Sequence, residues 1–295
     1  MIDDNYAPYA PGASTSQTSI NNRRPYDPGV LGQNIYLASN QTASYHSLQV
    51  SANRPLTHNL LLNGYYVWSH SFQSANESAI GIATAQDWNN LWEERGPMDD
   101  DQRHMASISG LWNIDYFRGS SVVKQIVNGW TISPIVSLHS GTPFEVTTGS
   151  NKNLDSQNHS RPDLVAGVDA FLDPHRSRQI ARYEWFNTAA FINNGPGVPG
   201  GIGPGGADGN TPRDYLRAPG YRDIDLGVFR DIHFERFVFQ IRGEATNAFN
   251  MVSLNAPGSS GPPPTVGAKP SSSTFGVITA AASPRLIQVG ARLTF

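Results

Sequence analysis

The last eleven residues, Arg285 to Phe295, read R-L-I-Q-V-G-A-R-L-T-F and decide the fold of the chain. Every second residue from Ile287 to Phe295 is apolar. The residues between them, together with Leu286, are mostly polar. A period of two is typical of a β-strand with one apolar and one polar face. A strand that runs to the final residue fits a transmembrane barrel, and it fits the edge strand of a soluble sandwich equally well.

The composition favours a β-rich fold. Charged residues make up 15% of the 295 residues, against roughly 25% in ordinary soluble domains. The 28 glycines and 21 prolines suit strands joined by long irregular loops, and they argue against helices. A net charge of -3 with no basic stripe excludes nucleic acid as a partner.

Several chemistries are excluded by missing residue types. The chain has no cysteine, so it has no disulfide, no thiolate metal site and no cysteine nucleophile. The first residues, Met1 to Ala10, lack a basic region followed by an apolar run, so we expect that an exported protein of this sequence would start further upstream. No run of eighteen apolar residues occurs, which excludes helical membrane spans.

The same alternation of apolar and polar residues occurs in six earlier segments, so seven strands are predicted. The earlier strands begin at Ala43, His58, His104, Trp130, Tyr221 and Phe237. Pro134 lies in the middle of the fourth strand and predicts a bulge or a local break there, because proline cannot donate to a strand ladder.

The connections between these strands alternate in length. The shorter ones are 54–57, 117–128 and 232–236, and the longer ones are 72–102, 149–220 and 250–283. Bacterial barrels have short periplasmic turns and long extracellular loops, whereas a sandwich has no reason to segregate loop length by side.

The fold class predicted is therefore all-β, an antiparallel transmembrane β-barrel segment of about seven strands. The predicted division of the chain is a loop or arm at 1–41, barrel strands one to four at 42–148, a long extracellular loop at 149–220, and the last three strands at 221–295, which end in Phe295.

Several motifs carry a family resemblance from about residue 42 to the end. They are Y-H-S-L-Q-V at 45–50, D-x-R-H at 101–104, N-G-W at 128–130, S-G-T-P-F at 140–144, R-P-D-L from 161, W-F-N-T-A-A-F at 185–191, R-A-P-G-Y-R-D-I-D-L at 217–226, E-A-T-N-A-F-N at 244–250, and the terminal strand. With these motifs the sequence resembles the C-terminal barrel portion of TonB-dependent outer-membrane transporters, and in particular the Oar-like group.

The resemblance implies a place in the bacterial outer membrane and uptake of a large or scarce nutrient. It implies a 22-stranded barrel closed by an N-terminal plug, of which this chain would be a fragment. The implied partners are outer-membrane lipid, the barrel-assembly machinery through the C-terminal strand, and the TonB complex through N-terminal parts that the chain lacks. It implies no cofactor and no enzymatic activity.

Catalytic and metal motifs are weak. Gly201 to Gly206 matches G-x-G-x-x-G by letters, but it follows a coil and no strand, so it fails as a dinucleotide site. Asp99, Asp100 and Asp101 near His104 could hold a hard cation, and a solvated acidic stretch is the favoured interpretation. We predict no catalytic residue and no metal site.

Two sets of residues are the candidates for function. The loop candidates for substrate binding are Trp88, Trp92, Asp99, Asp100, Asp101 and Trp185, and loop packing is the alternative role for the aromatic ones. The predicted membrane-interface aromatics are Tyr66, Trp68, Trp112, Trp130 and Phe295.

A second class of protein stays open at this level: a soluble secreted all-β carbohydrate-binding module, or a hydrolase that uses Asp or Glu carboxylates. The two classes differ in what the apolar strand faces touch. In a barrel Ile287, Val289 and Leu293 point to lipid, whereas in a sandwich they meet the apolar face of a second sheet.

Overall fold

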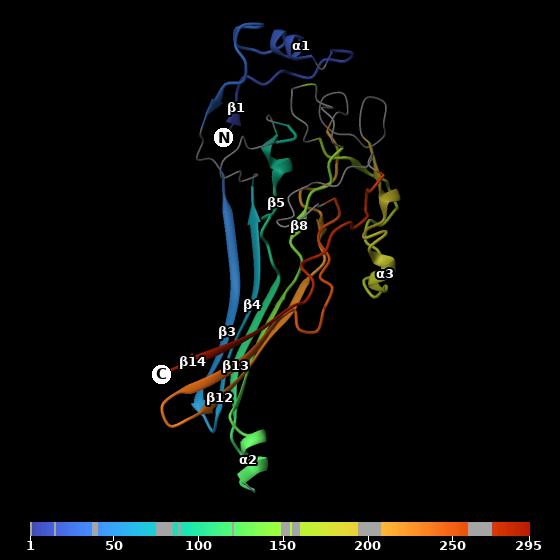
Figure 1. Cartoon of the computed structure of the whole chain (residues 1–295). Helices are drawn as coiled ribbons and strands as arrows, with labels where there is room; N and C mark the ends of the chain where they lie inside the picture. Colours follow the sequence, from blue (N-terminus) through green and yellow to red (C-terminus); the bar gives the residue numbers. More distant parts are fainter. Residues whose placement is uncertain are drawn as a thin grey trace.

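Seven long strands form one antiparallel sheet (Figure 1). The computed structural model describes residues 2–14, 16–36, 41–74, 85–87, 90–119, 121–148, 154, 160–193, 208–258 and 273–295. The long strands are β3 (Ala43–Thr57), β4 (Leu60–Gln73), β6 (His104–Ile114), β7 (Trp130–His139), β12 (Tyr221–His233), β13 (Val238–Thr246) and β14 (Leu286–Thr294).

The sheet is a meander in which each long strand pairs with its neighbours along the chain. The order is β14-β13-β12-β7-β6-β4-β3, and every pair is antiparallel. The predicted all-β, antiparallel fold is confirmed. Within the described ranges β3 and β14 each have a long-strand partner on one side only, so the sheet is open and does not close into a barrel.

The strand register brings most of the apolar residues of the seven strands onto one face. Val289 lies opposite Gly243, which lies opposite Val228, and Val228 lies opposite Ile132. We call this side the apolar face. It carries Leu48, Val50, Leu62, Tyr66, Trp68, Ile108, Trp112, Trp130, Ile132, Val136, Leu138, Ile224, Leu226, Val228, Phe239, Ile241, Ile287, Val289 and Leu293.

The opposite side, the polar face, carries the intervening residues, such as Ser107, Ser137 and Glu244. A slip of one residue in any strand pair would exchange the two faces. The alternation read from the sequence therefore persists across the whole sheet.

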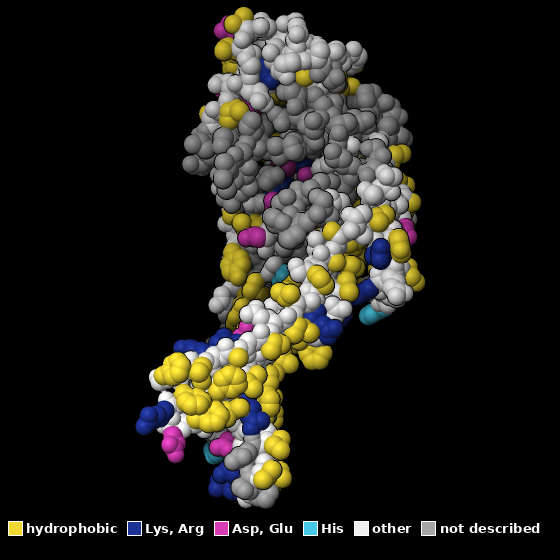
Figure 2. All heavy atoms as spheres, viewed as in Figure 1, with side chains coloured by type: hydrophobic (Ala, Val, Ile, Leu, Met, Phe, Trp, Pro, Cys, Tyr) yellow, Lys and Arg dark blue, Asp and Glu magenta, His cyan; other side chains and the backbone are white. Residues whose placement is uncertain are grey.

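No described part of the chain covers the apolar face. Val289 is 77% exposed and Ile287 is 61% exposed. Figure 2 shows a field of hydrophobic side chains over β12, β13 and β14. The other sheets among the described residues are two-stranded, and none packs against this face as a second layer. The soluble sandwich considered from the sequence is therefore wrong for this chain.

All three long connections leave the sheet at one end, which we call the loop end, and the three short ones leave at the opposite end, the turn end (Figure 1). The short connection between β6 and β7, predicted at 117–128, holds an element that the sequence did not predict. It contains helix α2 (Ser121–Val127). Gly129, with φ of 81°, follows this helix and returns the chain to β7, as glycine commonly does after a helix.

Pro134 interrupts one of its two ladders. The β7–β12 register runs through Pro134, which lies opposite Leu226. The β6–β7 register passes from Ser109–Ile135 to Trp112–Ile132 and omits the pairs between them. The local break predicted from proline is therefore confirmed on the β6 side.

Short elements complete the chain. They are β1 (Ile2–Asp3), α1 (Gln17–Asn22), β2 (Ile35–Tyr36), η1 (Leu91–Glu94), β5 (Gly96–Pro97), β8 (Pro143–Phe144), β9 (Asp163–Leu164), α3 (Arg178–Ala181), η2 (Thr188–Ala190), β10 (Phe191–Ile192) and β11 (Leu216–Arg217). Near the N-terminus β1 pairs with β2, and buried Arg24 contacts the carboxylate of Asp3 at 3.4 Å.

Candidate functional site

The long connections pack together into a unit at the loop end that we call the loop cap: the described residues of 74–103, 140–220 and 247–285. It has its own hydrophobic core, in which Phe186 lies 5.4 Å from Phe191 and 5.0 Å from Phe275 between ring centroids. The buried members of this core are Phe144, Val146, Ala170, Phe186, Ala190, Phe191, Leu216, Ala218 and Ala256.

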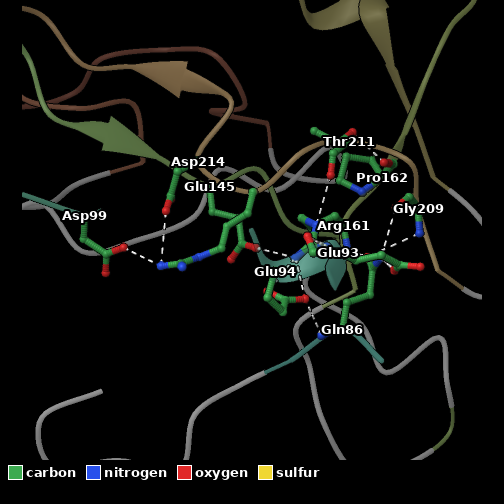
Figure 3. Close-up of polar contacts among 11 residues, drawn as sticks. Gln86, Glu93, Glu94, Asp99, Glu145, Arg161, Pro162, Gly209, Thr211 and Asp214 are labelled. Carbon is green, nitrogen blue, oxygen red and sulfur yellow. Dashed lines mark hydrogen bonds and ion pairs between the residues drawn. The ribbon is translucent and has the colours of Figure 1, made fainter. Parts of the chain in front are cut away.

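A buried arginine links distant parts of the cap (Figure 3). Nη1 of Arg161 donates to both carboxylate oxygens of Glu94, at 2.9 and 3.0 Å, and lies 3.3 Å from Oε1 of Glu145. Nε donates to the carbonyl of Thr211, and Nη2 donates to the carbonyl of Glu93, both at 3.0 Å. A buried charge needs such partners, because burying it without them is costly.

Gln86 extends the same network (Figure 3). Its backbone N–H donates to Glu94 at 2.9 Å, and its side-chain oxygen accepts from the N–H of Arg161 at 2.7 Å. Its side-chain amide donates to the carbonyl of Gly209 at 3.0 Å. The network thus joins the first long connection to two segments of the second, 75 and 123 residues further along the chain.

A second charged group lies beside this network. Arg213 contacts Asp99 at 2.6 Å and Asp214 at 3.2 Å. Burial raises the pKa of Asp214 well above its ordinary value, against the attraction of Arg213. Burial also raises the pKa of Glu145 to about 7, and the attraction of Arg161 only partly opposes the rise. Two carboxyl groups in one region therefore titrate near neutral pH or above it.

Asp101 behaves in the opposite way. Burial alone would raise the pKa of Asp101, but hydrogen bonds from Ser71, Arg217 and His70 outweigh it and lower that pKa to about 2. The Ser71 N–H donates at 2.6 Å and Arg103 Nε at 3.1 Å, and Arg217 forms a further ion pair. This carboxylate anchors the loop end of β4 to β11.

The predicted loop candidates separate into two groups. Asp99 forms an ion pair with Arg213, and Asp101 forms one with Arg217. Trp185 donates its indole N–H to the carbonyl of Arg217 at 2.7 Å. Asp101 is buried, so the interpretation of the acidic stretch as solvated is wrong at this position. Asp100 and Trp92 are exposed, and the Trp92 ring carries the Arg95 guanidinium 5.6 Å from its centroid.

Two other predictions fall where the structure gives no description. Trp88 and the glycine-rich stretch at 201–206 lie outside the described residues. Within the described ranges, no group of three or more His, Asp or Glu side chains is placed to hold a metal ion.

Two cavities lie on the polar side of the sheet near the loop end. One of about 890 Å³ is lined by Tyr45, Tyr65 and Asp100. The other, of about 400 Å³, is lined by Asp223, by Asn255 and by the stacked rings of His139 and Tyr221, whose centroids are 5.0 Å apart. Asp100 is the only one of the loop candidates predicted from the sequence, among those the structure describes, that lines either cavity.

Sequence reasoning did not find the residues at the centre of the cap. Arg161 was noticed only as the start of the R-P-D-L motif, and Glu94, Glu145 and Gln86 were not singled out. Composition does not single Arg161 out, because the loop at 149–220 holds six other Lys and Arg residues. Periodicity could not find it, because the pairing groups are far apart in sequence.

The predicted interface aromatics lie on the apolar face in two groups. Trp68, opposite His104, is near the loop end, and Trp112, opposite Leu60, is near the turn end. The eight steps along the chain from His104 to Trp112 span about 27 Å of strand. The remaining members are Tyr66 near the loop end, with Trp130 and the exposed Phe295 near the turn end.

An open antiparallel meander with one exposed apolar face and a packed loop cap defines the chain as part of a membrane-barrel type of protein. Its sequence matches the family model described as Outer membrane beta barrel domain over residues 1–288. The chain belongs to this family, which places it in the bacterial outer membrane.

No curated protein matches the chain, and no solved structure does. Among the described residues, no helix is both long enough and apolar enough for a membrane span.

Proposed function

We propose that the chain is the C-terminal barrel portion of a TonB-dependent, Oar-like transporter that takes up a large or scarce nutrient. The observation that carries the proposal is the meander itself. Its connections alternate strictly between short and long ones, and the motifs of that group fall on the long strands, at strand ends and in the loop cap. In the complete transporter the seven strands would be part of about 22, with a plug preceding them.

The spacing of the aromatic side chains supports a membrane-spanning role. Trp68 and Trp112 bracket about 27 Å of strand, which at a tilt of roughly 35–45° covers about 20 Å of the apolar band, about 25 Å tall, that outer-membrane barrels carry between two aromatic girdles. The polar face would then line the interior. Phe295 follows β14 at the turn end, where we propose that the barrel-assembly machinery engages the last strand.

Among the predicted loop candidates, we propose that Asp100 and Trp92 contact the substrate. Both are exposed, and Asp100 has no ion pair to a described residue. Asp99, Asp101 and Trp185 already hold parts of the cap together, so their role would be to position the loops. Trp88 remains a candidate from the sequence alone.

Deletion of the encoding gene tests the transport proposal. Growth would be measured with ferric siderophores, cobalamin or oligosaccharides as the sole iron, vitamin or carbon source. We expect a defect on at least one of these that equals the defect from removing TonB, with no further loss in the double deletion. Normal growth on every source, or a defect that adds to loss of TonB, would contradict the proposal.

Point variants then test the proposed contacts. Replacing Asp100 or Trp92 by alanine should reduce uptake of the identified nutrient while leaving the amount of protein in the outer membrane unchanged. The matched control is Asp173→Ala, which changes another exposed carboxylate of the cap. Equal losses from Asp100→Ala and from the control would refute a specific contact.

A further inference from the structure

The turn end of the sheet carries an amphipathic helix whose apolar side nothing in the described chain covers. In α2 the four apolar residues Val122, Val123, Ile126 and Val127 are all exposed, and Ile126 is 62% exposed. At 100° per residue these four lie within an arc of about 140°. Lys124 projects on the other side of the helix.

The helix is fixed to the apolar face of the sheet. The carbonyl of Ile126 accepts from Nε1 of Trp130 at 2.9 Å and from Nη1 of Arg230 at 3.3 Å. Trp130 and Arg230 are register partners on that face, and the guanidinium lies 5.1 Å from the centroid of the indole ring. The last turn of α2 therefore adjoins the membrane-facing side of the sheet and not its polar side.

Local contacts fix the loop that holds this helix. Asn128 donates to the carbonyl of Phe117 at 2.9 Å and accepts from its N–H at 3.1 Å. A seven-residue helix is too short to be stable alone in water. Exposed β-branched residues on such a helix would be unfavourable there, so a medium that takes up apolar side chains would stabilise it.

We infer that α2 is an interfacial helix that rests its apolar side in the periplasmic leaflet of the outer membrane. The occupant is phospholipid, because α2 lies just beyond the turn end of the sheet (Figure 1) and its Ile126 carbonyl binds Trp130 and Arg230, which belong to the membrane-facing side. Lys124 and Arg230 would then meet anionic lipid headgroups, as basic residues do on interfacial helices. This inference goes beyond transport and does not depend on it.

The absence of cysteine allows a direct test, since one introduced cysteine gives one label. Ile126→Cys reports on the apolar side of α2 and Lys124→Cys on its opposite side. Val289→Cys reports on the middle of the apolar face. Ile180→Cys is the matched control, because Ile180 is also 62% exposed but lies on α3 in the loop cap.

Each variant would carry an environment-sensitive fluorophore, in the whole chain in phosphatidylethanolamine and phosphatidylglycerol vesicles. Lipids with a nitroxide near the headgroup or at the end of the acyl chain would serve as quenchers. We expect a blue shift at position 126 with quenching by the shallow nitroxide, and quenching at 289 by the deep one. Position 124, among the headgroups, should shift less than position 126, and position 180 should keep emission typical of water.

Two results would overturn the inference. Emission at 126 that matches 180, with 289 still quenched by lipid, would mean that the sheet meets the bilayer and the helix does not. Water-like emission at both 126 and 289 would refute the membrane-facing role of the sheet together with that of the helix. The two failures are therefore distinguishable, and neither concerns the nutrient carried.

Discussion

The sheet and the loop cap are stabilised in different ways. None of the buried hydrophobic residues of the described chain lies in the seven long strands, whereas the cap contains a core around Phe186 and the buried ion pair of Arg161 with Glu94. The cap is thus built like a small water-soluble domain. The sheet exposes its apolar side chains and needs a surrounding that accepts them, which the outer membrane provides.

The largest expected effect concerns the cap. Arg161→Met would leave Glu94 buried without its partner, and breaking a buried pair in this way costs about 3–5 kcal/mol. Hydrogen exchange followed by mass spectrometry should reveal faster exchange in peptides from 160–193, and unchanged exchange in β12 and β13.

The control for this variant is Arg236→Met, which alters an exposed arginine in a short turn. Such surface changes usually shift stability by less than about 0.5 kcal/mol. If β12 and β13 lost protection together with the cap after Arg161→Met, the two regions would form one cooperative unit and the contrast between them would be wrong.

The second prediction concerns the sheet. Val289→Lys puts a charge on the apolar face, where a cation at the bilayer midplane costs about 2–4 kcal/mol. Urea titration of the chain in phospholipid vesicles should give a lower midpoint. Gln288→Lys, on the polar face one residue away, should leave the midpoint nearly unchanged. Equal shifts for the two variants would mean that both faces meet the same surroundings.

The third prediction uses the pH dependence of the cap. The pKa of Glu145 is raised from 4.5 to about 7. Between pH 4.5 and 7 the carboxyl of Glu145 is therefore protonated in the folded cap and ionised in the unfolded chain. Its stabilisation is complete below pH 4.5 and is lost as the pH rises through 7, a change of about 3 kcal/mol. Exchange rates in the cap should rise over this window, and Glu145→Gln should reduce the rise while leaving the part that belongs to Asp214.

The smallest expected effect has the opposite sign. The pKa of Asp101 is lowered from 3.8 to about 2, so its contribution is present above pH 3.8 and is lost as the pH falls through 2. The change is about 2 kcal/mol at most, because its partners His70 and Arg103 are partly exposed to solvent. Asp101→Asn should abolish the acid-dependent loss of protection at the loop end of β4, and persistence of that loss would contradict the assignment.

The strands of the sheet could be predicted from the sequence because their signal is local. An alternation such as Ile287, Gln288, Val289 indicates directly which side chains share a face. Pro134 likewise predicts the break in the β6–β7 ladder. The cap could not be predicted in this way. The side chain of Gln86 donates a hydrogen bond to Gly209, which lies 123 residues further along the chain, and no periodic pattern in the sequence connects the two.

Helix α2 was missed for a different reason. Its sequence, S-V-V-K-Q-I-V, is rich in β-branched residues, which have low helix propensity. The helical spacing of its apolar side chains extends over only two turns, too short a stretch to stand out. The resemblance to transporters located the chain in the outer membrane, but it contained no information about this turn.

The meander also determines the sequence of events during assembly. Because each long strand pairs only with its chain neighbours, the three hairpins with short connections can form first, and pairing across the three long connections can follow. The contact of Gln86 with Gly209 can form only after β6, β7 and the segment up to residue 209 are present. We therefore expect the cap to become ordered late, after the sheet has formed and has brought the ends of the three long connections close together.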